Sequence, residues 1–547
     1  MRVDLMVHNA NILTLHEAHP RAHSMAVHHG RVVALDDTSH LTAAAVLDAR
    51  GATITPGFAD AHNHMAWFGL GLSEIDLSGL TGLHQLYRRV TDRAAQLGPD
   101  DYVIGTGYDH TLLGGHPHRA DLDAAAGGRP VWLRHRSGHV SSVNTPVLAA
   151  TGLLDGSTPV PAGGVMAHDE HGPTGVLEEQ AQNLVVDLVM PYPLHRLQAA
   201  VARASQVYAS EGLTHVTEAG IGSGWMGKSP LELAAYQAAR DAGELCVRVQ
   251  LMPTVDALHP VSGHAGDAMT FGLDLGMRTG FGDDWVRLGP MKIWLDGSLV
   301  ARTAAVLEPF CDHGHGHRHG YFQADPEAMT DQVVAAHAGG WRVACHAIGD
   351  RAVDLALEAF EHAHAKHPRP DVRHRIEHAG ITRPDQLQRM ADPGVIPVPQ
   401  HHFLYEIGDT MAEAVGADRQ PMLYRHASFL AAGLCVPGSS DRPVAPGPPL
   451  AGIQSMVLRR TRAGNTLGPD ERVDVHTALR AYTIDAAWAA GEEDQRGTLA
   501  PGKLADFVLL GDDITAIDPD RIAATEVVAT FAGGRCTHGK EAVPAAP

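Results

Sequence analysis

The middle of the chain alternates between short apolar runs and helical patterns, and this alternation constrains the fold more than any other feature of the sequence. Eight strand-like runs follow one another at 58–64, 213–218, 246–252, 286–295, 341–346, 372–377, 394–398 and 433–438. Helical patterns separate several of them, at 230–242, 326–339, 352–366 and 383–391. Strands that alternate with helices predict a parallel sheet, and eight such units predict a (β/α)8 TIM-like barrel of the α/β class.

Two β-rich ends and one insertion complete the predicted domain organisation. Residues 1–57 and 491–547 contain short strand patterns separated by turns. Because chain termini often lie close together, we predict that the two ends join in one small β-sandwich domain. Residues 58–490 then form the barrel. The segment at about 70–205, rich in Gly, Pro and Asp, is interpreted as a large insertion after strand one.

Composition and charge exclude several classes of function. Apolar residues make up 44% of the 547 residues, which is enough for a substantial core. The net charge of −21 and the lack of a basic stripe argue against nucleic acid as a partner. No apolar run reaches the roughly 18 residues of a membrane span, so no membrane association is expected. Five scattered cysteines and an N-terminus without signal-peptide features predict a reduced, cytoplasmic protein.

A histidine pair ends the first predicted barrel strand. The run PGFADAHNH places His62 and His64 one residue apart after an apolar segment. Alternate residues of a strand face the same side, so both imidazoles are placed to bind one metal ion. The chain contains 37 histidines, and such pairs also occur by chance. The interpretation therefore depends on the other segments.

Lysine is rare in this chain, and one lysine lies inside an apolar run. Only five of the 42 basic residues are lysine, and Lys292 lies within the run 286–295. Burial of its ammonium group would lower its pKa. A neutral lysine amine reacts with CO2 to give a carbamate, which can bridge two cations as a carboxylate does. The structural alternative is an ion pair between Lys292 and an acid such as Asp296.

Three further candidates end later strands of the predicted barrel. These are His346, His378 and Asp441. Each alone is explained as well by packing or by capping. Together with the histidine pair and the lysine, however, they all fall at the carboxyl ends of predicted strands, where the active sites of such barrels lie. The coincidence predicts a metal centre at this face.

In order and spacing, these motifs resemble the amidohydrolase superfamily and, within it, the YtcJ-like (amidohydrolase 3) group. The segments that carry the resemblance are PGFADAHNHM, RHRSGHVSSVNTPVLAATG, MKIWLDGSLVARTA, CHAIGD, RIEHA, GSSDRPV and GTLAPGKLADFVLL. They extend over nearly the whole chain. Deformylation of N-substituted formamides is among the activities known in the group.

The resemblance implies a binuclear metal centre. Its six implied ligands are His62, His64, Lys292, His346, His378 and Asp441. Zn2+ is the expected metal, in two copies, with other divalent transition metals as alternatives. The lysine would carry a CO2-derived carbamate that bridges the ions. Asp441 would hold a metal-bridged hydroxide and act as proton shuttle, and Lys292 and His346 are the other expected catalytic residues.

Other residues are secondary candidates. His139 and Asn144 match a pattern of the group and are candidates for substrate contacts, with a structural role as the alternative. Glu377, Asp350 and Asp60 are close in sequence to the expected ligands and are candidates to orient imidazoles.

The predicted function is metal-dependent hydrolysis of an amide-like C–N bond in a small molecule, such as an N-acyl or N-formyl amine. One alternative is a heterocycle deaminase, which in this superfamily commonly uses one metal and no bridging lysine. Another is a metal-free scaffold that has kept the fold. The histidine-rich segment 313–319 is interpreted as a solvated loop, with a lid or an extra metal contact as the alternative. Similar proteins are commonly dimers, so the resemblance is compatible with a homodimer.

Overall fold

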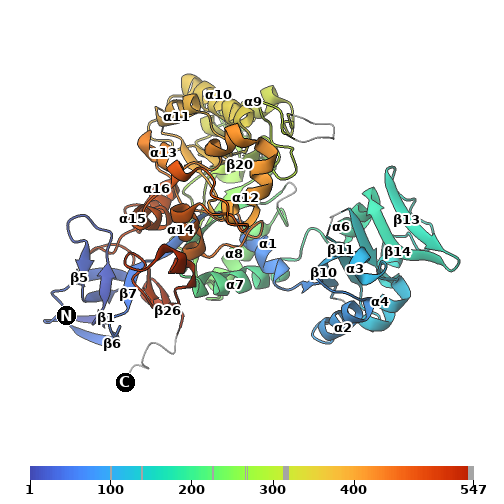
Figure 1. Cartoon of the computed structure of the whole chain (residues 1–547), viewed down its shortest axis with the longest axis horizontal. Coiled ribbons are helices and arrows are strands. Elements are labelled where there is room, and N and C mark those ends of the chain that lie inside the picture. The colour runs from blue at the N-terminus through green and yellow to red at the C-terminus, as the bar shows by residue number, and fades with distance from the viewer. Residues whose placement is uncertain are drawn as a thin grey trace. The chain divides into compact units, whose positions relative to one another are not determined.

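The computed structural model describes residues 1–98, 101–136, 139–223, 227–264, 266–267, 269–311, 319–392 and 394–539. The chain divides into two compact units (Figure 1). The first combines Met1–Ala66 with Val201–Pro547, and the second is Trp67–Ala200.

The first unit contains two four-stranded parallel sheets. One consists of β8 (Phe58–Asn63), β15 (Leu213–Ile221), β16 (Arg248–Pro253) and β19 (Val286–Leu288). The other consists of β20 (Met291–Trp294), β21 (Val343–Ala347), β22 (Arg375–His378) and β23 (Ile396–Val398). Each strand pairs with its neighbours in chain order. These strands confirm seven of the eight predicted runs.

The predicted strand at 286–295 is divided into β19 and β20. Gly289 and Pro290 separate the two strands, and proline has no N–H group to donate to a ladder. A parallel bridge between Thr254, which follows β16, and Lys292 in β20 connects the two sheets at this point.

The predicted strand at 433–438 is not a strand in the structure. Pro437, the next-to-last residue of the run, has no N–H group to donate to a ladder. The segment nevertheless runs beside β8, because Ala61 donates a 3.0 Å hydrogen bond to the carbonyl of Gly438. The amide of Asp441 likewise donates to the carbonyl of His62 at 2.7 Å. This pairing brings the residues after the segment to the carboxyl end of β8.

The helices at four predicted positions are confirmed within two residues at each end. They are α8 (Glu232–Asp241), α9 (Pro326–Ala338), α10 (Asp350–Lys366) and α11 (Pro384–Ala391). Pro326 at the start of α9 follows Asp325, whose carboxylate accepts a hydrogen bond from the amide of Ala328 and caps the helix. Further helices are α7 (Leu194–Ser210), α12 (His402–Val415), α14 (Pro449–Leu458), α15 (Val475–Arg480) and α16 (Ala486–Ala490). Within the described part of the chain, none of the helices combines the length and the apolar character needed to cross a bilayer.

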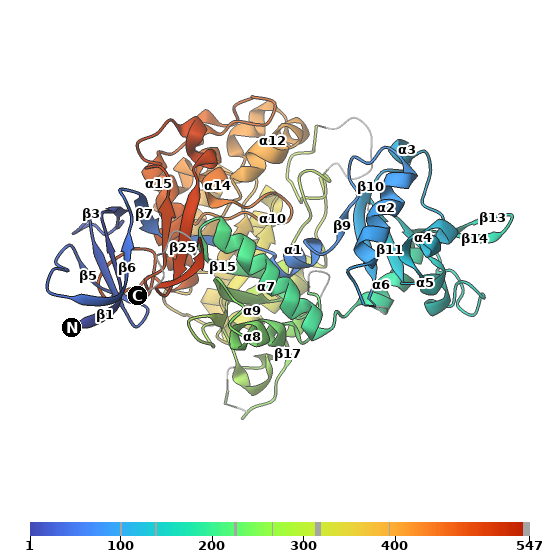
Figure 2. The ribbon, with the colours of Figure 1, turned by 90° about the horizontal axis from the view of Figure 1, so that it is seen from below.

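Strands from the two ends of the chain pair with each other in the first unit. β24 (Phe507–Leu510) lies antiparallel to β7 (Thr53–Pro56) and to β25 (Val527–Ala532) in a six-stranded sheet. The remaining members of that sheet are β2 (Asn11–Leu13), β3 (Arg21–Ala22) and β26 (Arg535–His538). A four-stranded sheet of β5 (Arg31–Leu35), β4 (Met25–His28), β1 (Arg2–His8) and β6 (Thr42–Asp48) shares one hydrophobic cluster with it. The N-terminal and C-terminal strands lie side by side in both views (Figure 2).

The second unit is built on a six-stranded sheet of its own. β10 (Val103–Tyr108) lies parallel to β9 (Ile75–Asp76) and to β11 (Val131–His135). β12 (Val140–Val143), β14 (Gly172–Glu179) and β13 (Gly164–Asp169) extend the sheet in antiparallel fashion. The helices α2 (Leu83–Ala94) and α4 (Arg119–Ala126) pack apolar residues against β10 and β11.

Candidate metal centre

Three of the predicted ligands converge at the carboxyl end of β8. One ligand atom from each of His62, His64 and Asp441 lies within 4.8 Å of the other two. Nε2 of His64 is 3.0 Å from Oδ1 of Asp441, and Nε2 of His62 is 3.4 Å from the same oxygen. His62 is 0% exposed and Asp441 6% exposed. The positive φ of Asp441, 58°, is uncommon for a non-glycine residue and indicates that its surroundings fix this conformation.

The geometry of these atoms fits a cation. Within the described residues, neither Nε2 of His62 nor Oδ1 of Asp441 has a hydrogen-bond partner, although both atoms are buried. Buried polar atoms without partners are rare because their desolvation is costly. Four ligands around zinc, at about 2.0–2.1 Å each, lie roughly 3.3–3.4 Å from one another. The observed separations of 3.0 and 3.4 Å are of this size.

Each predicted imidazole ligand directs one ring nitrogen toward a protein acceptor. Nδ1 of His62 lies 2.5 Å from a carboxylate oxygen of Glu377, and Nδ1 of His378 lies 2.6 Å from the amide oxygen of Gln400. Such partners fix the tautomer and leave the second nitrogen available to a metal.

The other two imidazoles follow the same rule. Nε2 of His346 donates to the carbonyl of Gly297 at 2.9 Å. Nδ1 of His64 lies 3.7 Å from Oε1 of Glu218. The other oxygen of this carboxylate, Oε2, accepts hydrogen bonds from the amide of Ala66 and the hydroxyl of Tyr236. All four rings are therefore oriented by second partners.

The carboxylate behind His62 is itself held by a buried arginine. Arg375 donates to both oxygens of Glu377, at 2.8 and 3.0 Å, and both residues are 0% exposed. Burial alone would raise the pKa of Glu377, but Arg375 and His62 hold it well below its usual range. Glu377 therefore stays ionised and keeps the imidazole of His62 in one tautomer.

The structure contradicts the alternative in which Lys292 pairs with Asp296. The carboxylate of Asp296 accepts hydrogen bonds from the amides of Ala305, Ile348 and Gly349, at 2.8 to 3.0 Å. Nζ of Lys292 is buried without a hydrogen-bond partner among the described residues. Burial lowers the pKa of this amine to about 8.

The remaining two predicted ligands, His346 and His378, lie near the group of His62, His64 and Asp441 but are not part of it. The ring of His378 is centred 4.9 Å from that of His62 and 4.5 Å from that of His346. Burial, followed by the charge of Lys292, lowers the pKa of His346 to about 3. Burial also lowers the pKa of His378 well below its usual range. Both rings are therefore neutral near pH 7, the form that binds metals. In the described chain, the tight group at this face contains only the two histidines of β8 and its loop with Asp441.

Of the three acids expected to orient imidazoles, only Glu377 contacts one. Asp60 accepts hydrogen bonds from the amides of His62 and Ser440, at 3.1 and 3.0 Å, and so ties β8 to the loop of Asp441. Asp350 accepts a hydrogen bond from the amide of Leu307. The expectation for these two acids is therefore wrong, because their partners are backbone amides, the hydroxyl of Ser440 and the guanidinium of Arg383 rather than imidazole rings.

The two substrate-contact candidates lie in the second unit. The amide of Asn144 is buried, accepts a hydrogen bond from the amide of Val131 and donates one to the carbonyl of Arg129, both at 2.8 Å. These contacts support the structural alternative for Asn144. His139 is exposed, with Nδ1 3.1 Å from a carboxylate oxygen of Glu179. In the loop 313–319, only His319 lies within the described residues.

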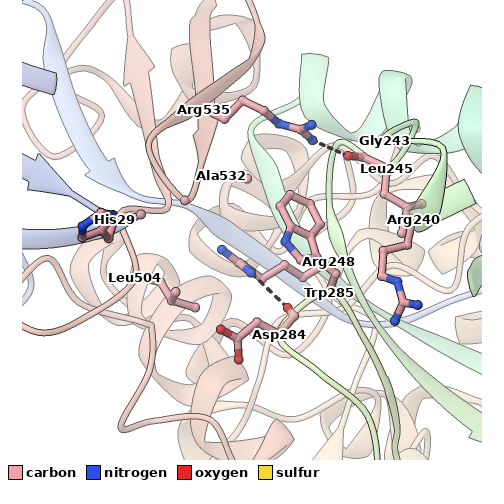
Figure 3. A pocket seen from close by; sticks show the side chains of 12 residues that line it. His29, Arg240, Gly243, Leu245, Arg248, Asp284, Trp285, Leu504, Ala532 and Arg535 are labelled. Carbon is pink, nitrogen blue, oxygen red and sulfur yellow. Dashed lines mark hydrogen bonds between the residues drawn. The ribbon is translucent and has the colours of Figure 1, made fainter. Parts of the chain in front are cut away.

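A cavity of about 380 Å3 lies in the first unit at the amino ends of β16 and β19 (Figure 3). Arg248 and Arg535 lie over the indole of Trp285, with guanidinium carbons 4.8 and 5.1 Å from the ring centre. Arg248 is paired with Asp506 at 2.8 Å. None of the predicted ligands lines this cavity, since those residues lie at the opposite ends of the strands.

Comparison with known proteins decides the family. The sequence model of the Amidohydrolase family matches residues 45–538 of this chain. The chain belongs to the amidohydrolase family. It is 31% identical to YtcJ of Bacillus subtilis over 90% of each chain, and 30% identical to the N-substituted formamide deformylase of Arthrobacter pascens over 97% of each. The crystal structure of an uncharacterized metal-dependent hydrolase from Pyrococcus furiosus matches 93% of this chain and 99% of its own, with a TM-score of 0.76 and 26% identity.

Membership of the amidohydrolase family establishes the coarse properties predicted from the sequence. The protein is a hydrolytic enzyme of a metal-dependent family with a mixed α/β fold of the TIM-barrel type. The sequence motifs also led to the correct group within the superfamily, that of YtcJ and the formamide deformylase. In this amidohydrolase, the buried donors at the end of β8 are the candidate metal ligands.

Proposed function

We propose that this amidohydrolase cleaves an amide-like C–N bond, that of an N-acyl or N-formyl amine, at the carboxyl ends of the parallel strands. The observation that carries the proposal is the convergence of His62, His64 and Asp441 on one point. Two of the buried ligand atoms, Nε2 of His62 and Oδ1 of Asp441, have no hydrogen-bond partner among the described residues. The relative from Arthrobacter pascens, named for deformylation of N-substituted formamides, supports the substrate class.

The donor set favours zinc as the metal of this centre. Imidazole and carboxylate donors suit zinc and related divalent transition metals. Two ions are proposed, with His62, His64 and Asp441 holding one and His346 and His378 holding the other. When bound, such ions supply Lewis acidity toward the substrate carbonyl and lower the pKa of the attacking water.

Lys292 is proposed to carry a carbamate between the two groups of ligands. Its amine loses a proton at a pKa of about 8, because the side chain is buried. The neutral amine adds to CO2, a C–N bond forms and one proton is released. The product is an anionic carboxylate-like group in place of a buried cation, which explains why no acid pairs with Nζ among the described residues.

Asp441 is proposed to move the proton in the reaction. Burial alone would raise its pKa, but the side chains of His62 and His64 hold the pKa well below the usual range. The ionised carboxylate accepts a proton from the attacking water and returns it to the leaving nitrogen. The C–O bond to the attacking oxygen forms first and the C–N bond then breaks, which gives an amine and a carboxylic acid that releases the second proton of the water to solvent.

The finer architecture is also proposed. The two parallel sheets are taken as one (β/α)8 barrel, with the segment before Asp441 in the place of the eighth strand. The hydrogen bond from Ala61 to Gly438 and the bridge between Thr254 and Lys292 support this closure. Residues 1–57 and 491–547 are proposed as the β-sandwich domain, and the segment at about 70–205 as the insertion.

The test is a substrate screen of the zinc-loaded full-length enzyme against N-formyl amines, N-acyl amines and aminated heterocycles. We expect turnover of an N-formyl or N-acyl amine and a metal content near two equivalents. The variant Lys292→Ala should lose the turnover and the bound metal. Activity confined to an aminated ring, with one equivalent of metal and no effect of Lys292→Ala on metal content, would support the deaminase instead.

A further inference from the structure

The second unit gathers three histidines and an aspartate at the carboxyl end of its parallel strands. Asp109 and His110 directly follow β10, and His135 ends the neighbouring strand β11. Tyr108 and His135 are paired across these two strands. The parallel register therefore places side chains from two segments at one edge of the sheet, and His116 in the following loop joins them.

Two imidazole nitrogens of this cluster lie about as far apart as two ligands of one cation. Nδ1 of His110 lies 3.1 Å from Nε2 of His135. One ligand atom from each of Asp109, His110 and His135 lies within 4.8 Å of the other two. Nitrogens bound to the same zinc ion at about 2.0–2.1 Å lie roughly 3.3–3.4 Å apart in a tetrahedral site. The two imidazoles thus need only a small movement to bind one ion.

A second layer of contacts holds the cluster in place. The ring of His116 stacks on that of His110, with centres 4.4 Å apart and planes inclined by 6°. Nδ1 of His116 is hydrogen-bonded to the hydroxyl of the buried Tyr108 at 3.0 Å. Arg136 holds one carboxylate oxygen of Asp109 at 2.8 Å. Metal ligands are commonly oriented by such second partners.

The protonation states also suit a metal. Burial lowers the pKa of His135 and of His116 and so favours their neutral forms. Neutral imidazole is the form that coordinates metals. The carboxylate of Asp109 remains ionised, because its hydrogen bond with Arg136 holds its pKa at about 2.

We propose that Asp109, His110 and His135 form a metal site of the second unit that binds one divalent ion of the zinc class. Water completes the tetrahedron, and the stacked ring of His116 positions His110. Two imidazoles and one carboxylate select zinc, nickel, copper or cobalt over magnesium and calcium, which prefer oxygen ligands. The site uses none of the donors at the end of β8 and does not depend on the proposed function.

The test counts cobalt equivalents bound to the full-length protein, by equilibrium dialysis with metal analysis. We expect His110→Ala to bind one equivalent less than the wild type. His135→Ala should lose the same equivalent. Because His110 is exposed, His110→Ala is the variant less expected to disturb folding. The matched control is His171→Ala, which removes an exposed histidine of the same unit and should lose none.

The two proposals fail separately in this experiment. A variant with His62→Ala and His64→Ala should lose the metal of the centre at β8 and keep the equivalent that depends on His110. If His110→Ala binds as much cobalt as the wild type, or if His171→Ala loses as much as His110→Ala, the site in the second unit does not exist.

Discussion

Nδ1 of His62 lies 2.5 Å from Oε2 of Glu377, although 315 positions separate the two residues in the chain. The contact joins β8 to β22, and Arg375 on the same strand holds both oxygens of the carboxylate. The orientation of the first candidate ligand thus depends on a buried ion pair on a distant strand. Because these contacts are connected, replacement of any one of these residues should change the affinity for the metal.

Replacement of Glu377 by Gln should weaken metal binding. The amide cannot match the negative charge that fixes the tautomer of His62, and loss of such partners typically lowers metal affinity about 10–100-fold. Arg375 would also remain buried without its counter-charge, which costs about 3–5 kcal/mol of the free energy of unfolding. Competition with a chelator and urea denaturation measure the two effects. The matched control is Glu361→Gln, at an exposed pair with Arg389, and equal effects of the two variants would contradict the account.

Replacement of Asp441 by Asn should reduce turnover about 10²–10⁴-fold, the usual contribution of a proton-transferring group. The amide cannot accept the proton of the attacking water. Steady-state kinetics with each variant saturated in zinc separates this effect from loss of metal. Wild-type turnover in the zinc-saturated variant would remove Asp441 from the mechanism.

Replacement of Gln400 by Leu should selectively weaken the ion assigned to His346 and His378. Gln400 accepts from Nδ1 of His378 at 2.6 Å and donates to the carbonyl of Val398. Without this acceptor the ring of His378 is no longer fixed, and an affinity loss of about 10–100-fold for one of two ions is expected. Metal titration monitors both ions, and an unchanged titration would show that Gln400 does not orient a ligand.

Glu232 should make the free energy of unfolding depend on pH. Burial, followed by the charge of Glu218, raises its pKa from 4.5 to about 8. The folded protein therefore binds this proton more tightly than the unfolded chain. The stabilisation is complete below pH 4.5 and is lost as the pH rises through about 8. As the pH rises over this range, the Tm of Glu232→Gln should fall less than the Tm of the wild type. Parallel plots of Tm against pH for the two proteins would exclude the effect.

The strand positions could be predicted from the sequence because burial on both faces leaves continuous apolar runs. The two differences have a local cause. Pro290 divides the fourth run, and Pro437 prevents the last run from forming a ladder. The positions of His62, His378 and Asp441 beside one another also follow from the parallel topology, since carboxyl ends of strands share one edge.

The partners of the ligands could not be predicted in the same way. Gln400, the acceptor for His378, lies just after β23. Glu218 lies within an apolar strand and accepts a hydrogen bond from the amide of Ala66, 152 residues away in the sequence. Nothing local distinguishes these residues from other polar residues, because their role arises only when distant strands pair. The same reason applies to Asp60, which lies two residues before His62 in the sequence, while its carboxylate contacts the amides of His62 and Ser440 and the hydroxyl of Ser440 instead of an imidazole.

The most direct test of the central claim is a crystal structure of the zinc-loaded enzyme with anomalous diffraction at the zinc absorption edge. The account predicts an anomalous peak within coordination distance of Nε2 of His62, Nε2 of His64 and a carboxylate oxygen of Asp441. It also predicts electron density for a carboxylated amine at Lys292. A zinc-loaded, active enzyme with no peak beside these three residues would contradict it.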